Sequence, residues 1–188
     1  LRSVRAAPGI GVIGPGARAG VAASPLKRIG VIATAGTVRS GAYTRAIGSV
    51  DSRAHVVARP APLLVPLAEE GWLDGDVPKQ VLERYLAPFA DDGIDALILG
   101  CTHYPLFRGL IEDIGRATLG PSLAVADSAD ATAGELSALL QDRAMLREGD
   151  GSLDVLVPAL PHPSHPVPSR LPRAPTLPPP PAHLLHPL

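Results

Sequence analysis

A thiol, a hydroxyl and an imidazole follow one another at Cys101, Thr102 and His103. Cys101 is the only cysteine of the chain, so any thiol chemistry depends on this residue. A thiolate acts as a nucleophile or a base, and a nearby imidazole can stabilise it or exchange a proton with it. A lone cysteine is also commonly a small buried apolar residue. From residue type and position alone, a functional role and a purely structural role of Cys101 are therefore about equally favoured.

The segments around this triplet predict how it is positioned. The apolar run 96–99 ends at Gly100, and Pro105 begins a new apolar-periodic segment. This order predicts a strand, a reactive turn and a helix start. Similar apolar runs predict strands at 29–34, 55–58, 95–99 and 123–126. Strands that alternate with helices predict an α/β fold, a four-stranded parallel sheet flanked by helices, with right-handed crossovers.

Helical spacing of apolar residues predicts four helices between and after these strands. The first covers 38–47. The second begins at an Asp76 cap with Pro78 in its first turn, and a proline-bounded loop at 62–67 precedes it. The third follows the cysteine turn, and its expected core-facing residues are Leu106, Leu110, Ile111 and Ile114. The fourth is capped by Ser128 or Asp130 and runs through Leu136, Leu139 and Leu140.

Polar residues cluster after the predicted strands. The carboxyl ends of parallel strands meet at one edge of a sheet, where ligands bind beside helix amino-termini. We expect the following residues to converge there: Thr34, Thr37, Glu69, Cys101, Thr102, His103, Asp127 and Ser128. The hydroxyl of Thr102 and the free N–H groups of a helix start are suited to binding a carboxylate.

The composition limits the class of protein. The formal net charge of −1 and the pI near 6.6 predict no nucleic-acid or membrane partner. A single cysteine fits a reducing, cytoplasmic location, and no apolar run is long enough to span a bilayer. The chain begins with Leu1 and its only methionine is Met145. We therefore expect a fragment or a processed product.

Both ends of the chain differ in character from the middle. Residues 1–27 predict a connector with a short strand, and residues 151–188 predict a proline-rich disordered tail. The GxGxxG spelling at 9–14 does not predict a dinucleotide site, because we expect no helix directly after it and the next carboxylate is Asp51. The tail histidines do not have metal-site spacing: His162, His165, His183 and His186. Between the ends we expect an α/β lobe at 28–127 and a return helix at 128–150.

Residues 100–106, Gly-Cys-Thr-His-Tyr-Pro-Leu, resemble the second cysteine motif of bacterial glutamate racemases, members of the aspartate/glutamate racemase superfamily. The resemblance covers about residues 9–142. Further matching segments lie at 11–13, 15–19, 29–34, 36–37, 39–43, 65–67 and 69–71. The histidine after Cys-Thr favours glutamate racemases over aspartate racemases.

The resemblance implies an enzyme of two α/β lobes that interconverts L- and D-glutamate for peptidoglycan synthesis, with no cofactor and no metal. One thiol from each lobe faces the Cα atom of glutamate. Cys101 is then the acid/base thiol of the second lobe. Thr102 and His103 contact the substrate or tune the thiol, Glu69 or its neighbour Glu70 assists near the ammonium group, and Thr34 and Thr37 line the site.

The sequence also departs from this family. The first-lobe motifs Asp-Ser-Gly, Pro-Tyr-Gly and Cys-Asn-Thr are absent from it, Gly14 replaces a usual glutamate, and Ala61 replaces a common cysteine. Beyond about Arg147 the proline-rich tail replaces the family's last segment, as a shifted reading frame would produce. We therefore expect a glutamate racemase fragment with an exposed, easily alkylated Cys101.

Such a fragment lacks the first lobe needed for a complete site, unless a homodimer builds one. The alternatives are a folded lobe that binds or pairs without turnover, another amino-acid racemase of the superfamily, and a cysteine hydrolase or transferase that uses Cys101 and His103.

Overall fold

Four parallel strands form the sheet of residues 10–146, the part of the chain that the computed structural model describes. They are β1 (Arg28–Ala33), β2 (His55–Pro60), β3 (Ala96–Gly100) and β4 (Ala124–Asp127), in the order β2-β1-β3-β4. The predicted four-stranded parallel sheet is confirmed. Strand β2 lies at an edge of the sheet. Its last residue, Pro60, has no N–H to donate, and an edge strand tolerates this because no further strand needs that hydrogen bond.

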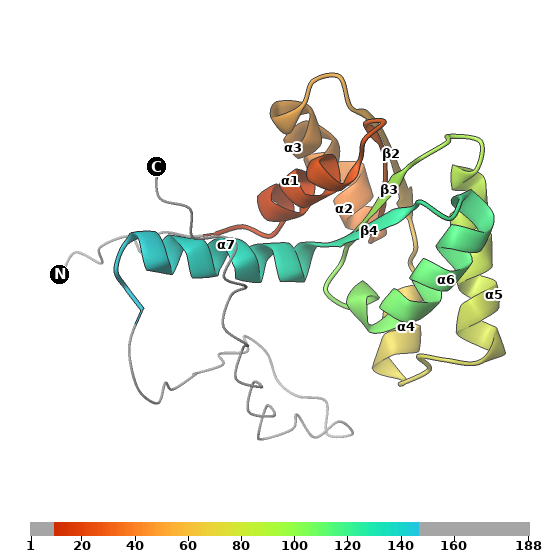
Figure 1. Cartoon of the computed structure of the whole chain (residues 1–188). Helices are drawn as coiled ribbons and strands as arrows, with labels where there is room; N and C mark the ends of the chain where they lie inside the picture. The colour runs from red at the N-terminus through yellow and green to blue at the C-terminus, as the bar shows by residue number, and fades with distance from the viewer. Residues whose placement is uncertain (1–9, 147–188) are drawn as a thin grey trace. The chain divides into compact units, whose positions relative to one another are not determined.

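Helices cover both faces of this sheet (Figure 1). One face carries α1 (Ile13–Ala23), α2 (Ala35–Ser40) and α3 (Ala42–Val50), with α7 (Ser128–Asp142) beside α1. The other face carries α4 (Leu64–Glu69), α5 (Asp76–Leu86) and α6 (Arg108–Leu119), with the short 3₁₀ helices η1 (Ala87–Phe89) and η2 (Tyr104–Phe107). The apolar runs of the central strands are continuous because both of their faces are buried.

Strand β3 separates two apolar cores. Leu97 and Leu99 pack towards α4, α5 and α6, among large buried side chains such as Phe89 and Phe107. Ile98 points the other way and packs with Ile29 and α1. This alternation is the normal two-residue period of a strand. It fixes β3 tightly, so the residues that follow it have a rigid support.

Helix α1 was not expected, because residues 13–23 lie in the predicted connector with its short strand. That strand prediction is wrong for these residues. Gly16 and Gly20 lower the intrinsic helix propensity, but they let the helix approach the sheet, since a Cβ atom on Gly20 would overlap the side chain of Ile98. A helix therefore does follow the GxGxxG stretch, although the distance to Asp51 remains too long for a dinucleotide site.

Three further boundaries differ from the predictions. The helix expected at 38–47 is divided into α2 and α3 by Gly41, which adopts a left-handed φ of 62°. The loop expected at 62–67 contains the start of α4. Helix α5 begins at Asp76 as predicted, but its cap is Gly75 and Asp76 makes no capping bond. Proline is tolerated in the first turn of a helix. This explains why Pro78 marked the start of α5 correctly, and why the prolines around α4 did not exclude a helix there.

Two side-chain predictions are also corrected. Leu106 is 56% exposed, and the residue that packs into the core at this point is Phe107, 1% exposed. The reason is that η2 is a 3₁₀ turn, so the helical period used for the prediction starts only at Arg108. Helix α7 is capped neither by Ser128 nor by Asp130. Its cap is Asp127, whose carboxylate accepts from the N–H of Ala129 at 2.7 Å.

The residues outside 10–146 are not described by the structure. The predicted tail at 151–188 with its four histidines, and the first nine residues of the predicted connector, lie there. The proposed boundaries at 27, 127 and 150 stay predictions. Among the described helices, none combines the length and the apolar character that crossing a membrane requires.

Asp95 joins the start of β3 to the segment before β1. Its carboxylate accepts hydrogen bonds from the Ser24 hydroxyl and from the backbone N–H groups of Leu26, at 2.6 Å, and Arg28, at 3.3 Å. Partial burial raises the pKa of this carboxyl, but the hydrogen bonds together outweigh burial and hold the pKa below its usual value. The ionised form is therefore the one that stabilises the fold.

We expect Asp95→Asn to lower the free energy of unfolding at pH 7 by roughly 1–3 kcal/mol, the usual worth of hydrogen bonds to a charged group. Because the folded pKa is lowered, this contribution is present above the unfolded pKa of about 4 and is lost as the pH falls through the folded value. Urea unfolding at pH 7 and pH 3 measures it, with Asp91→Asn as the exposed control. A difference between wild type and variant that is equal at both pH values would contradict this account.

Candidate active site

The connections between strands identify one position where a site is expected. The crossover from β1 to β2 carries α2 and α3 on one face, whereas the crossover from β3 to β4 carries α6 on the other. Neighbouring strands whose connections leave in opposite directions form a switch point, where ligands of parallel sheets bind. Ala33 pairs with Gly100 at the ends of these two strands. Thr34 and Cys101 come directly after them.

A tight turn presents Cys101. Its carbonyl accepts from the N–H of Tyr104 at 3.2 Å, so the chain passes from β3 straight into η2. Gly100 is required before it, because a Cβ atom there would lie 2.9 Å from the ring of Tyr43 and 3.1 Å from the carbonyl oxygen of Ile32. Cys101 itself is half-buried and free. The turn therefore keeps the thiol at the surface of a rigid strand end.

An imidazole lies between the thiol and a carboxylate. His103 Nδ1 is 3.8 Å from the Sγ atom of Cys101, and His103 Nε2 is 3.8 Å from Oε1 of Glu69. Glu69 is 63% exposed, so this contact contributes little to the stability of the fold. Of the two neighbouring glutamates, Glu70 instead lines an apolar groove beside Trp72. The structure thus brings Glu69, His103 and Cys101 together, and it places Glu69 rather than Glu70 beside the imidazole.

A cavity of about 140 Å³ opens beside the thiol, between β3, β4 and the helices of one face. The exposed Thr102 and the buried Asp127 both lie along it. Its lining residues are Val12, Tyr43, Leu99, Gly100, Cys101, Thr102, Asp127, Ser128 and Ala129. Within residues 10–146 no three His, Cys, Asp or Glu side chains are grouped as metal ligands would be.

Two buried tyrosines flank the thiol. The hydroxyl of Tyr43 lies 2.8 Å from Ser128 Oγ, and that of Tyr104 donates to the carbonyl of Ala61 at 2.7 Å. Burial raises the pKa of both phenols, and a negative charge on Cys101 would raise it further. Both therefore stay neutral at physiological pH. Neither tyrosine can serve as a base there.

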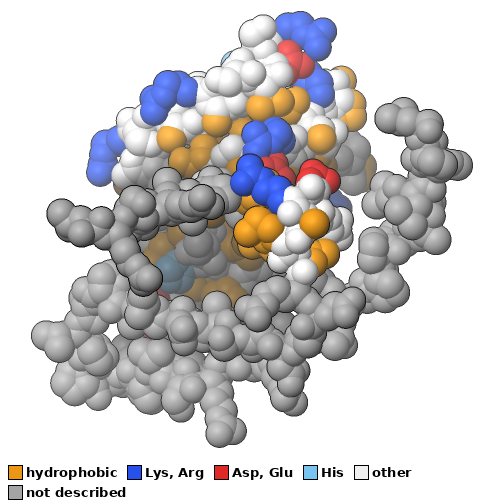
Figure 2. All heavy atoms as spheres, turned by 90° about the vertical axis from the view of Figure 1, so that its left-hand side faces the viewer, with side chains coloured by type: hydrophobic (Ala, Val, Ile, Leu, Met, Phe, Trp, Pro, Cys, Tyr) orange, Lys and Arg blue, Asp and Glu red, His pale blue; other side chains and the backbone are white. Residues whose placement is uncertain are grey.

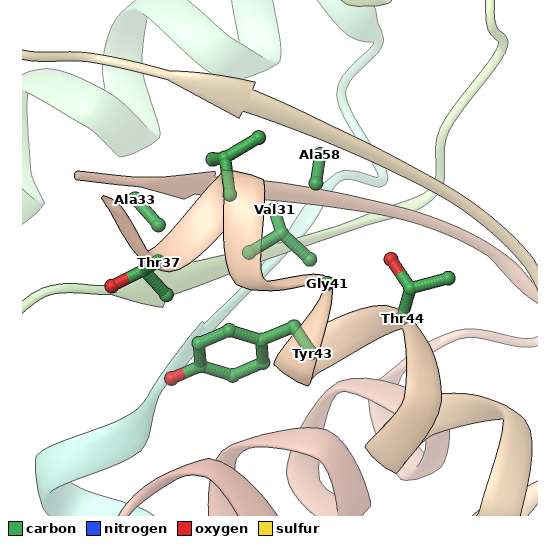
Figure 3. A pocket seen from close by; sticks show the side chains of 8 residues that line it. Val31, Ala33, Thr37, Gly41, Tyr43, Thr44 and Ala58 are labelled. Carbon is green, nitrogen blue, oxygen red and sulfur yellow. The ribbon is translucent and has the colours of Figure 1, made fainter. Parts of the chain in front are cut away.

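Thr34 and Thr37 lie at the neighbouring strand end but do not line the thiol cavity. Thr34 caps α2, since its Oγ1 accepts from the N–H of Thr37 at 3.3 Å, and the two hydroxyls are 3.0 Å apart. Thr37 instead lines a separate cavity of about 10 Å³ with Val31, Gly41 and Tyr43 (Figure 3). That volume is the size of one water molecule, so no amino acid fits there.

Tyr43 is the site residue whose place in the cavity sequence reasoning missed. It lies in the helix predicted at 38–47, and the hydrogen bond to Ser128 joins residues 85 positions apart in the sequence. Arg108 Nη1 lies 4.0 Å from Oδ2 of Asp127, a residue of the cavity lining. Arg18 of α1 bonds Glu135 of α7 at 2.6 Å, and on the face shown in Figure 2 basic side chains stand next to acidic ones.

Comparisons with known proteins identify the family to which this chain is similar. The profile of the family described as Asp/Glu/Hydantoin racemase matches residues 1–136. Glutamate racemase of Geobacter metallireducens is 42% identical over 147 residues, which are 78% of this chain and 53% of that protein. Glutamate racemase of Chlorobaculum tepidum is 43% identical over 155 residues, 82% of this chain and 53% of that protein.

Solved structures are similar as well. A glutamate racemase isoform of Bacillus anthracis superposes with a TM-score of 0.70 at 37% identity, over 79% of this chain and 54% of that one. Glutamate racemase of Francisella tularensis, solved in complex with D-glutamate, gives a TM-score of 0.67 at 33% identity, over 78% of this chain and 52% of that one. The chain therefore spans about half the length of the relatives it matches.

Proposed function

Because the chain belongs to the Asp/Glu/hydantoin racemase family, we propose that it carries one half of a glutamate racemase site, with Cys101 as one of two acid/base thiols. The observation that carries this proposal is the Cys101–His103–Glu69 arrangement at the switch point of the sheet. Its relatives at 42% and 43% identity are glutamate racemases. The activity would supply D-glutamate for peptidoglycan in the cytoplasm.

The chemistry needs a base that is held in place. The Cα proton of an amino acid is very weakly acidic, so the enzyme must preorganise the base and stabilise the charge that develops. In one direction of the proposed reaction the Cys101 thiolate takes the proton from Cα while the opposite thiol delivers one to the other side. In the reverse direction the Cys101 thiol delivers the proton. His103 lies beside the sulfur, and its second nitrogen is 3.8 Å from Glu69. This exchange of one proton requires no cofactor.

Substrate binding is assigned to the same rim. Thr102 and the N–H groups of the turn after Cys101 are suited to a carboxylate of glutamate. Thr34 and Thr37 lie at the next strand end, where they would reach the substrate only from outside the thiol cavity. We therefore rank Thr102 and His103 above Thr34 and Thr37 as substrate contacts.

A site with only one thiol can carry out only one of the two proton transfers. Inversion needs a proton removed from one side of Cα and returned on the other, and Cys101 can serve only one side. The relatives are about twice as long as the matched region, so we propose that the half not matched here supplies the opposite thiol. A second copy of this chain in a homodimer is the other way to supply one.

The test is incubation of the chain with L-glutamate in deuterated water, followed by NMR of the Cα proton and by optical rotation. We expect no inversion from the chain alone, and inversion after addition of the unmatched half of a relative. Inversion by the chain alone would contradict the half-site and point to a homodimer.

The competing functions give other results in the same experiment. A lobe that binds without turnover, which the half-length match also favours, would bring no inversion in either mixture. A cysteine hydrolase would give neither exchange nor inversion with glutamate. With an ester or amide substrate it would expel the alcohol or amine and form an acyl-thiol on Cys101, visible as a mass increase of the intact chain.

A further inference from the structure

Two buried hydroxyls connect α3 and α7 to the end of β3. Ser128 Oγ donates to the carbonyl of Leu99 at 3.1 Å and lies 2.8 Å from the hydroxyl of Tyr43. A serine hydroxyl has one proton. Because that proton goes to Leu99, the proton between the two hydroxyls must come from Tyr43. The direction of the whole series is therefore fixed: Tyr43 donates to Ser128, and Ser128 donates to Leu99.

This series is closely packed. Tyr43 is 4% exposed and Ser128 is 7% exposed. A Cβ atom on Gly16 of α1 would overlap the Ser128 hydroxyl, so the glycine leaves the room that the serine fills. The Tyr43 ring also lies against Gly100, the residue between Leu99 and Cys101. Residues of α1, α3 and α7 thus pack together at the end of β3, directly before the thiol.

We propose that Tyr43 and Ser128 are positioning residues, which fix the end of β3 and thereby hold the Cys101 sulfur beside His103. The inference deepens the proposed function and rests on it only for the statement that the thiol does the chemistry. The hydroxyl series acts through the Leu99 carbonyl and the Tyr43 ring through Gly100, both next to the reactive turn. Without them, the sulfur would no longer be confined to its position near Nδ1 of the imidazole.

Several titratable groups face the thiol and must be considered with it. His103 and Tyr104 come from the turn and η2, Tyr43 comes from α3, and Asp127 comes from β4. Glu69 acts behind the imidazole. Tyr43→Phe removes a phenol that is neutral at pH 7 because burial raises its pKa, and both Tyr43→Phe and Ser128→Ala leave His103, Asp127 and Glu69 in place. A change in thiol reactivity in these variants therefore reports a change in the position of the sulfur.

The experiment measures alkylation of Cys101 by iodoacetamide from pH 5 to pH 10, together with urea unfolding. Since Cys101 is the only cysteine, the reaction is specific without further changes. We expect Tyr43→Phe and Ser128→Ala each to slow alkylation about threefold at pH 7 and to move its pH profile upward, because only the thiolate reacts. The double variant should show the effect of one single variant, because the two hydroxyls act as one unit.

Tyr104→Phe is the matched control, because it also removes a buried hydroxyl close to Cys101 but one that bonds Ala61. It should lose similar stability and keep the wild-type pH profile. The proposal is overturned if the profile of Tyr43→Phe stays unmoved, if Tyr104→Phe moves it equally, or if the two single effects multiply in the double variant. If Ser128→Ala does not fold, Tyr43→Phe against Tyr104→Phe still decides. Alkylation needs neither glutamate nor another lobe, so a failed racemase assay leaves this test intact.

Discussion

Cys101→Ala is expected to lower glutamate racemisation about 10³-fold or more when the chain is combined with the unmatched half of a relative, since general acid–base groups contribute 10² to 10⁴. The loss should appear in both directions, from L- to D-glutamate and back, because each direction uses this thiol once. Cys101→Ser should behave similarly, because a hydroxyl is a far weaker acid than a thiol and does not provide the base at neutral pH. Circular dichroism of the glutamate solution follows the reaction.

The matched control for this variant is Ser49→Ala, which removes an exposed hydroxyl on α3 far along the chain from the thiol. It should leave the rate of the combined protein unchanged. Deuterium incorporation separates two explanations of a loss in Cys101→Ala. Exchange into one enantiomer without inversion would show that the opposite thiol still works. Full inversion at the wild-type rate would remove Cys101 from the mechanism.

Phe107→Ala is expected to lower the free energy of unfolding by about 3–5 kcal/mol, the usual cost of truncating a buried phenylalanine. Phe107 is 1% exposed and packs in the core beneath α5 and α6. Its neighbour Leu106 is 56% exposed, so Leu106→Ala should change stability by only about 0.5 kcal/mol. The two adjacent positions form a matched pair in which only burial differs greatly.

Urea unfolding of both variants, followed by tryptophan fluorescence, tests this pair. The chain's single tryptophan, Trp72, reports the transition. The result would contradict the structure if Leu106→Ala cost as much as Phe107→Ala, because Leu106 would then face the core as the helical period of the sequence predicts. Equal and small costs would show that η2 contributes little to the packing of this face.

The strands were predictable from sequence because their burial makes them recognisable. A strand covered on both faces must be apolar throughout, and β1 and β3 are such strands. Helices α1 and α4 were not predictable in the same way, because glycine and proline in their sequences argue against a helix. Their formation depends on packing against the sheet, which a local pattern does not contain.

The candidate site was predictable in part for a similar reason. Cys101, Thr102 and His103 are adjacent in sequence, so their types alone located the reactive turn. The contact of Glu69 with His103 required the strand-end argument, and only the structure favours Glu69 over Glu70. The pairing of Tyr43 with Ser128 joins distant elements. Such a contact follows from the tertiary fold and has no counterpart in the spacing of residues.

The order of the strands has a consequence for synthesis of the chain. Strand β1 pairs with both β2 and β3, and β3 emerges from the ribosome only after α4 and α5 have been made. Contacts between segments far apart in sequence form slowly. During translation one edge of β1 is therefore unpaired until the strand that precedes Cys101 arrives, and β4 can join only after that. The nascent chain exposes an apolar strand edge for this interval, which makes the reactive turn one of the last parts of the lobe to be assembled.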